Sequence, residues 1–101
     1  MDEQDRVAAF VAEHDLRAPP AYRLLDLTSE VGELANDAAE TTGYGDDPDA
    51  LSIAADEIGD VLFALLALAL DLDVDASEAL ETALEKYERR LATSGDPSSG
   101  E

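Results

Sequence analysis

The stretch Asp56–Leu70, DEIGDVLFALLALAL, decides the fold of this chain. It predicts a helix so apolar that most of its surface must be buried, yet Glu57 and Asp60 stand near its start. An ionised carboxylate in apolar surroundings is costly unless a cation or hydrogen bonds offset the lost hydration. Two carboxylates three residues apart lie on the same side of a helix and repel each other. This pair of acids therefore indicates a bound cation.

A second pair of acids with the same spacing, Glu30 and Glu33, lies in SEVGELAND at 29–37. It belongs to a helix predicted from about residue 20 to 41. The apolar residues of that helix follow the spacing of a buried face: Leu24, Leu27, Val31, Leu34, Ala35 and Ala38. Asp26 and Asp37 extend the acid pair into a stripe beside this face, without a partner cation. A divalent metal ion shared by four carboxylates is the most economical explanation of both pairs.

The spacing of the two pairs places them at the same height. A turn at about 42–48 joins the two helices. If the helices end near Thr41 and begin near Asp49, Glu33 lies eight residues before the first point and Glu57 eight after the second. Glu30 and Asp60 each lie eleven residues away. Because a short loop makes helices antiparallel neighbours, we expect Glu33 beside Glu57 and Glu30 beside Asp60. Oxygen ligands without His suit Mg²⁺ or Mn²⁺, whereas a ferritin-like di-iron site needs Glu-x-x-His pairs.

The rest of the chain predicts two further helices and no strand. One runs from residue 2 to about 16, with Val7, Phe10 and Val11 at helical spacing, and ends before the prolines at 19–20. The helix that contains Glu57 and Asp60 is predicted from about 48 to 70. The last helix follows a capping box at 75–78. Its apolar side consists of Ala79, Leu80, Ala83, Leu84, Tyr87 and Leu91.

These elements predict one all-α domain, a four-helix bundle over residues 1–92, followed by a disordered tail over 93–101. A chain of 101 residues has few other elements to cover so apolar a helix. We therefore expect dimerisation to complete the bundle.

Composition excludes several classes of function. The chain has 25 acidic and 6 basic residues and a net charge of -19, which disfavours binding to nucleic acid or to an anionic membrane surface. The absence of cysteine excludes disulfides and thiolate sites. The longest apolar run, 61–70, is half of the roughly 20 residues that a bilayer needs, so we expect a cytoplasmic protein. The scarcity of lysine and the abundance of Asp and Ala resemble halophilic proteins.

Three of the six cations lie near the end of the last helix: Lys86, Arg89 and Arg90. They have two interpretations. Mg²⁺ sites often complete their coordination with substrate phosphates, which these cations would contact. Cations are also favoured near any helix C-terminus. Similarly, Ala64 and Ala67, on the acid-bearing side of the third helix, either leave room for a ligand or allow close helix packing.

The ordered pairs, Glu30-Val-Gly-Glu33 and Glu57-Ile-Gly-Asp60, resemble the ExxE and ExxD motifs of the MazG-like nucleotide pyrophosphohydrolases. Neighbouring segments are similar too, over roughly residues 24–91: SEVGELA at 29–35, YG at 44–45, GDVL at 59–62 and EKYERR at 85–90. The resemblance implies an all-α nucleoside triphosphate pyrophosphohydrolase fold, usually a dimer or a dimer of dimers.

The resemblance also implies an activity and a site. The activity is the Mg²⁺-dependent cleavage of a nucleoside triphosphate to the monophosphate and pyrophosphate, with Mn²⁺ as a substitute, in nucleotide-pool house-cleaning. The implied metal ligands are Glu30, Glu33, Glu57 and Asp60. Glu33 and Glu57 are the candidates for the carboxylate that activates water. Lys86 with Arg89 or Arg90 matches the basic segment that contacts phosphates.

Alternatives to this activity remain open. A phosphoribosyl-ATP pyrophosphohydrolase has similar carboxylate pairs, and a relative directed at dUTP or dCTP is another possibility within the superfamily. From a different class, the chain could be a non-catalytic helical interaction module. Four acids at one height beside an apolar helix favour the enzyme. The chain shows no clear counterpart of the aromatic residues with which some relatives stack the base.

Overall fold

The computed structural model describes residues 2–95 of the chain. This part consists of four α-helices and one 3-10 turn, and it contains no strand. The elements are α1 Asp2–Glu13, α2 Pro20–Thr41, η1 Pro48–Ala50, α3 Ala55–Asp71 and α4 Ala76–Thr93. The predicted all-α class is confirmed. Most of the predicted tail, residues 96–101, lies outside the described residues, while Thr93 is the last residue of α4.

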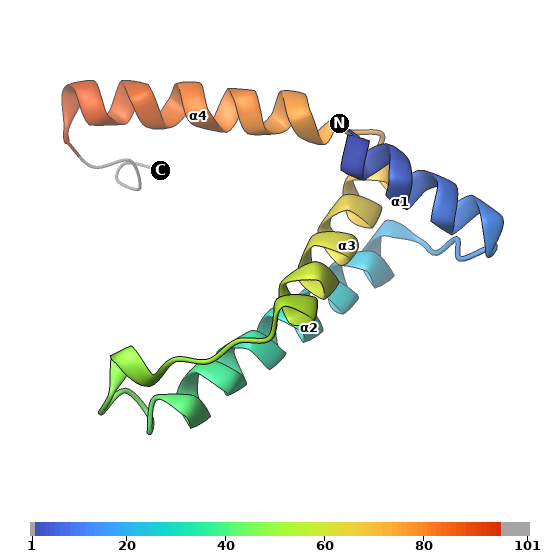
Figure 1. Cartoon of the computed structure of the whole chain (residues 1–101). Coiled ribbons are helices and arrows are strands. Elements are labelled where there is room, and N and C mark those ends of the chain that lie inside the picture. The colour runs from blue at the N-terminus through green and yellow to red at the C-terminus, as the bar shows by residue number, and fades with distance from the viewer. Residues whose placement is uncertain (1, 96–101) are drawn as a thin grey trace.

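Helices α2 and α3 lie side by side and antiparallel, and α1 lies across the C-terminal part of α3 (Figure 1). The buried cluster sits where α1 meets α3. It consists of Val7, Val11, Leu66 and Ala67, with Phe63 and Ala76 packed against it. None of the helices between residues 2 and 95 has both the length and the apolarity needed to cross a bilayer.

The prediction that the third helix begins near Pro48 is wrong, because α3 begins only at Ala55. Residues 48–50 form the 3-10 turn, and the Asp47 side chain makes no capping hydrogen bond to start an α-helix. The backbone N–H of Ser52 instead donates to the Thr41 hydroxyl at 3.1 Å. This bond holds the following residues in an extended link beside the end of α2.

A buried arginine ties the end of α3 to the start of α2. Arg23 is 6% exposed, and its Nε donates to the Asp71 carboxylate at 2.8 Å. A second guanidinium nitrogen donates to the Leu16 carbonyl. One side chain therefore joins α2, the far end of α3 and the link that follows α1.

A buried glutamine on α1 holds the connection between α3 and α4. The Gln4 amide donates to the Val74 carbonyl at 2.7 Å, and its oxygen accepts from the backbone N–H of Ala76 at 2.8 Å. Asp73 adopts a left-handed conformation in this connection (φ 56°), and Asp75 caps α4 by accepting from the N–H of Glu78. These contacts set the direction in which α4 leaves the rest of the chain.

We expect Gln4→Ala to destabilise the protein by about 1–2 kcal/mol, because it removes two hydrogen bonds and leaves two backbone groups without partners. Urea denaturation followed by circular dichroism measures this change. Glu13→Ala, an exposed acid at the end of the same helix, is the matched control. Equal midpoints for the two variants would show that Gln4 does not hold the connection.

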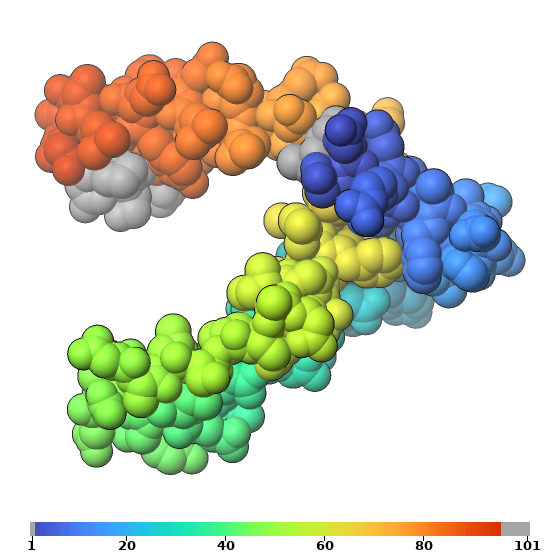
Figure 2. All heavy atoms as spheres, viewed as in Figure 1, coloured from blue at the N-terminus to red at the C-terminus, as the bar shows by residue number. Residues whose placement is uncertain are grey.

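Helix α4 extends away from the other helices, like an arm (Figures 1 and 2). Its apolar side is exposed: Leu80, Leu84, Tyr87 and Leu91 keep 39–52% of their surface accessible. Several apolar residues of α2 and α3 are exposed as well, by 42–54%: Leu24, Val31, Ile58, Leu62 and Leu65. The apolar spacing of the sequence predicts buried helix faces, and in a single chain these faces remain largely exposed.

Candidate functional site

The acids of α2 and α3 face each other across the helix pair. We call Asp26, Glu30, Glu33 and Asp37 of α2, with Glu57 and Asp60 of α3, the acidic site. Burial and repulsion by Glu33, Asp60 and Asp26 raise the pKa of Glu30 above its ordinary value. Carboxylates from both helices therefore lie within electrostatic reach of each other.

Glu57 has the most perturbed carboxyl of the acidic site. A side-chain hydrogen bond with Asp37, together with burial and repulsion by Asp37, Asp56 and Glu33, raises the pKa of Glu57 to about 7. The expected neighbour Glu33 is thus within electrostatic reach, but the hydrogen bond goes to the residue one turn further along α2. The tilt of helical side chains explains the choice of Asp37. Each side chain leans toward the N-terminus of its own helix, and in this antiparallel pair the N-terminus of α3 lies beside the C-terminus of α2, so Glu57 leans toward the end of α2.

Glu30 and Asp60 line one hollow of about 290 Å³ between α2 and α3. Its other lining residues are Arg23, Asp26, Ser29, Phe63, Ala64 and Ala67. Ala64 and Ala67 are 5% and 1% exposed. Both interpretations of these alanines therefore hold, since they are packed against their neighbours and also leave space beside the acids.

The donor chemistry of the acidic site fits a hard divalent cation, which prefers carboxylate oxygens. Its electrostatics fit as well, because every charge that acts on the pKa of Glu30 or Glu57 is negative. Within residues 2–95, no three acidic or histidine side chains converge closely enough to hold a metal together. Like charges oppose such convergence until a cation lies between them.

The pKa of Glu57 predicts how the stability of the metal-free protein varies with pH. Because the pKa of Glu57 is higher in the folded than in the unfolded state, its protonated carboxyl stabilises the fold fully at pH values below its ordinary pKa of 4.5. This stabilisation is lost as the pH rises through the folded-state pKa of about 7. Glu57→Gln retains a hydrogen-bond donor to Asp37 and has no such loss. In EDTA, we expect the Tm of the wild type to fall relative to that of Glu57→Gln between pH 4.5 and 8. Parallel Tm profiles would contradict this prediction.

The structure does not bring the predicted phosphate-binding cations to the acidic site within one chain. Lys86, Arg89 and Arg90 lie on the projecting helix α4, and the Lys86 ammonium lies 5.4 Å from the centre of the Tyr87 ring. The cation beside the acids is Arg23, which the sequence analysis did not select. Its partner Asp71 and the Leu16 carbonyl already occupy its guanidinium.

Asp37 is a further residue that sequence reasoning did not select for the site. It lies four residues after Glu33 and was recognised as part of the acid stripe, but it falls outside the ExxE motif. Asp37 could have been selected from the tilt of side chains in antiparallel helices, because this tilt predicts that Glu57 contacts a residue closer to the end of α2 than Glu33.

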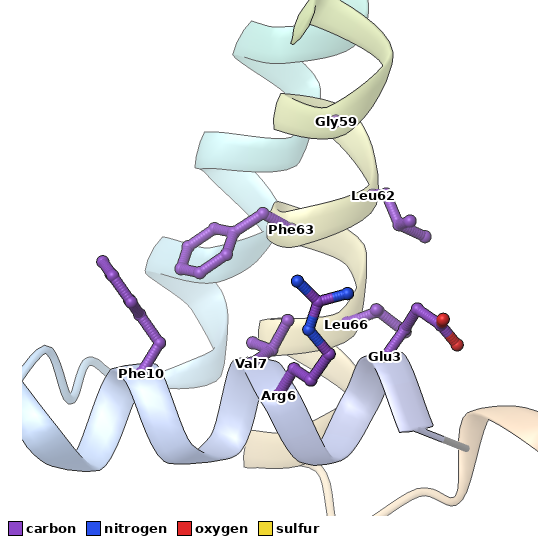
Figure 3. A pocket seen from close by; sticks show the side chains of 8 residues that line it. All are labelled: Glu3, Arg6, Val7, Phe10, Gly59, Leu62, Phe63 and Leu66. Carbon is purple, nitrogen blue, oxygen red and sulfur yellow. The ribbon is translucent and has the colours of Figure 1, made fainter.

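A second, apolar hollow adjoins the acidic site. It measures about 440 Å³ and lies between α1 and α3 (Figure 3). Its lining residues are Glu3, Arg6, Val7, Phe10, Gly59, Leu62, Phe63 and Leu66. Phe63 lines both hollows and meets Phe10 edge to face, with ring centroids 6.0 Å apart. Phe63 is therefore the lining residue that the two hollows share.

His14 directly follows α1 and is a surface residue. Its side chain is 50% exposed, its ring packs on Phe10 at 4.5 Å, and its Nε2 lies 3.4 Å from the Glu13 carboxylate. These contacts are those of a surface histidine beside an aromatic ring.

Comparison with known proteins places this helical domain in a family. Residues 20–93 match the MazG nucleotide pyrophosphohydrolase domain. The chain is also similar to "Uncharacterized protein YpjD" of Bacillus subtilis (strain 168), with 36% identity over 75 residues. That match covers 70% of this chain and 66% of the relative, so it spans just under two thirds of the relative's length. No solved structure matches the chain. The chain belongs to the MazG nucleotide pyrophosphohydrolase domain family, which confirms the resemblance drawn from its motifs.

Proposed function

We propose that this chain is a Mg²⁺-dependent nucleoside triphosphate pyrophosphohydrolase that converts an NTP or dNTP to the NMP and pyrophosphate, with a role in house-cleaning of the nucleotide pool. The observation that carries the proposal is the acidic site itself, in which Glu30 and Asp60 line one hollow between α2 and α3. Burial and neighbouring carboxylates raise the pKa of Glu30, and a hydrogen bond with Asp37, burial and neighbouring carboxylates raise that of Glu57. An interaction module has no use for such repulsion, whereas a metal-dependent hydrolase of the MazG family does.

The proposed roles follow from the chemistry of each side chain. Glu30, Glu33, Glu57 and Asp60 would hold Mg²⁺ or Mn²⁺. The bound ion would supply positive charge for the triphosphate, which a chain of net charge -19 otherwise repels. Glu33 or Glu57 would accept a proton from the water that attacks phosphorus, as the bond between the α- and β-phosphates breaks. Cationic side chains would stabilise the departing pyrophosphate.

A substrate panel tests this proposal. Pyrophosphate release is measured from canonical and modified nucleoside triphosphates, including dUTP and dCTP, and from phosphoribosyl-ATP, with Mg²⁺ or Mn²⁺ and in high salt. We expect metal-dependent release from at least one nucleoside triphosphate. Release from phosphoribosyl-ATP alone would assign the chain to that reaction instead. A folded protein that releases nothing and binds no metal would be an interaction module.

We also propose that the chain self-associates. Its accessible surface is 7129 Å², against about 5,500 Å² for a compact monomer of 10.7 kDa. Its radius of gyration is 16.5 Å, against about 13 Å for a compact domain of this length. The excess surface of about 1,600 Å² is of the size that each subunit buries in an obligate homodimer. A homodimer, or a dimer of dimers, would cover the exposed apolar faces of the helices.

A further inference from the structure

We propose that the apolar hollow between α1 and α3 binds the base of the substrate, and that the Glu3 carboxylate and the Arg6 guanidinium select guanine. This inference rests on the proposed function and deepens it, because it names guanine nucleoside triphosphates as the substrate class. Glu3 and Arg6 lie on α1, whereas the match to the MazG domain covers residues 20–93. The proposed selectivity therefore belongs to this chain and not to the matched domain.

The composition of the hollow is that of a site for a flat, largely apolar ligand. Its volume of about 440 Å³ falls within the range of small-molecule sites, which combine apolar walls with a few polar groups. Among its lining residues only Glu3 and Arg6 are charged, and both side chains extend from α1 toward α3 (Figure 3). None of the ion pairs found within residues 2–95 involves either of them. Both groups are therefore available to a ligand.

Gly59 leaves the backbone of α3 uncovered where it lines the hollow. Its φ does not lie in the left-handed region, and an added Cβ would meet no atom within 4 Å. Nothing within the chain therefore requires glycine at this position, although glycine is among the least favourable residues of a helix interior. A flat ring that lies against the backbone does require it, because a side chain would take the place of the ring. The base therefore lies against Gly59.

The hollow lies where the base of a bound triphosphate must be. In a nucleoside triphosphate only the sugar separates the base from the α-phosphate, so the sites for base and phosphates have to adjoin. Gly59 of the apolar hollow and Asp60 of the acidic site are consecutive residues of α3. Phe63, one helical turn further along, lines both hollows. A nucleotide whose phosphates lie at Asp60 can therefore place its base in the apolar hollow.

The two charged groups match the polar edge of guanine. They stand three residues apart on α1, so they are neighbours on one face of the helix. A carboxylate offers two acceptor oxygens, and guanine presents its N1–H and N2–H donors side by side. A guanidinium offers a fork of donors that fits the O6 and N7 acceptors of guanine. Adenine has an amino group in place of O6, hypoxanthine lacks the N2 amino group, and the pyrimidines lack two adjacent donors.

Equilibrium binding of nucleosides tests the base site without catalysis. Guanosine, inosine and adenosine are titrated into the full chain in EDTA and high salt, and amide NMR shifts give each dissociation constant. We expect guanosine to bind at least about five-fold more tightly than the other two, because a bidentate hydrogen-bond pair contributes at least that discrimination. The amide of Gly59 should shift with it. Equal affinities, or no binding of guanosine, would overturn the proposal.

Three variants locate the binding. Glu3→Gln should remove the preference for guanosine over inosine, because the amide offers one acceptor oxygen where the carboxylate offers two. Gly59→Leu fills the hollow and should abolish binding. Gly32→Leu is its matched control, since Gly32 is also a helical glycine whose added Cβ meets nothing within 4 Å, but it lines neither hollow. Circular dichroism checks that all three are folded. A folded Gly59→Leu that binds guanosine as the wild type does would overturn the proposal.

The same chain distinguishes failure of this inference from failure of the proposed function. Selective binding of guanosine without pyrophosphate release from GTP or dGTP would support the base site and contradict the hydrolase. Pyrophosphate release with equal kcat/KM for GTP, ITP and ATP, unchanged in Glu3→Gln, would support the hydrolase and overturn the base site.

Discussion

Glu33→Gln and Asp60→Asn are each expected to lower the rate of pyrophosphate release about 100-fold or more. Even residues that only support a metal ligand typically contribute 10–100-fold, and these two are proposed to hold the ion directly. The measurement is initial-rate kinetics at saturating Mg²⁺, together with calorimetric titration of Mg²⁺ into each variant. Mg²⁺ affinity should fall with activity.

The matched control is Glu13→Gln, which removes the same charge from a side chain of α1 that is 74% exposed. It should retain the wild-type rate and Mg²⁺ affinity. If Glu13→Gln lost as much activity as the two site variants, general charge rather than the acidic site would be responsible. Full activity in Glu33→Gln or Asp60→Asn would remove that residue from the site.

The largest expected effect on stability is that of Arg23→Met. Removing one partner of a buried ion pair leaves the other charge uncompensated, which costs about 3 kcal/mol. Asp71, whose side chain is 18% exposed, would be left in this state, and the Leu16 carbonyl would lose its donor. For a domain of about 100 residues this corresponds to a fall in Tm of about 10 °C or more. Thermal unfolding in high salt measures it.

Arg17→Met is the control for this prediction. Arg17 also lies near an aspartate, but its side chain is 84% exposed and that of Asp15 is 89% exposed. Exposed ion pairs contribute little, so its Tm should be close to that of the wild type. Equal losses in both variants would show that the Arg23 contacts do not hold α2 and α3 together.

The helical class and the antiparallel packing of α2 on α3 could be predicted from the sequence, because apolar spacing and a short loop determine both. The start of α3 could not, since the bond between Ser52 and the Thr41 hydroxyl leaves no trace in local composition. The hydrogen bonds of Gln4 could not be predicted from the sequence either, because their partners lie 70 and 72 residues away along the chain. Contacts of this kind depend on how the helices are arranged, and spacing along one helix does not report them.

The acid residues could be predicted as a set, but not all of their partners. Equal distances from the turn place Glu57 near Glu33, whereas the tilt of the side chains directs it to Asp37. The apolar spacing of α4 predicts a side that prefers burial, but the structure leaves Leu80, Leu84 and Leu91 exposed. Spacing does not say whether a covering surface belongs to the same chain. That distinction depends on the direction of the connection at 72–75.

The central claim is that the acidic site uses a divalent cation to cleave a nucleoside triphosphate between its α- and β-phosphates. Phosphorus-31 NMR of the protein with a substrate triphosphate, before and after addition of Mg²⁺, tests it most directly. The account predicts no change before the metal, and afterwards the growth of pyrophosphate and nucleoside monophosphate signals in equal amounts. Orthophosphate and nucleoside diphosphate as products, or equal rates in EDTA, would contradict it.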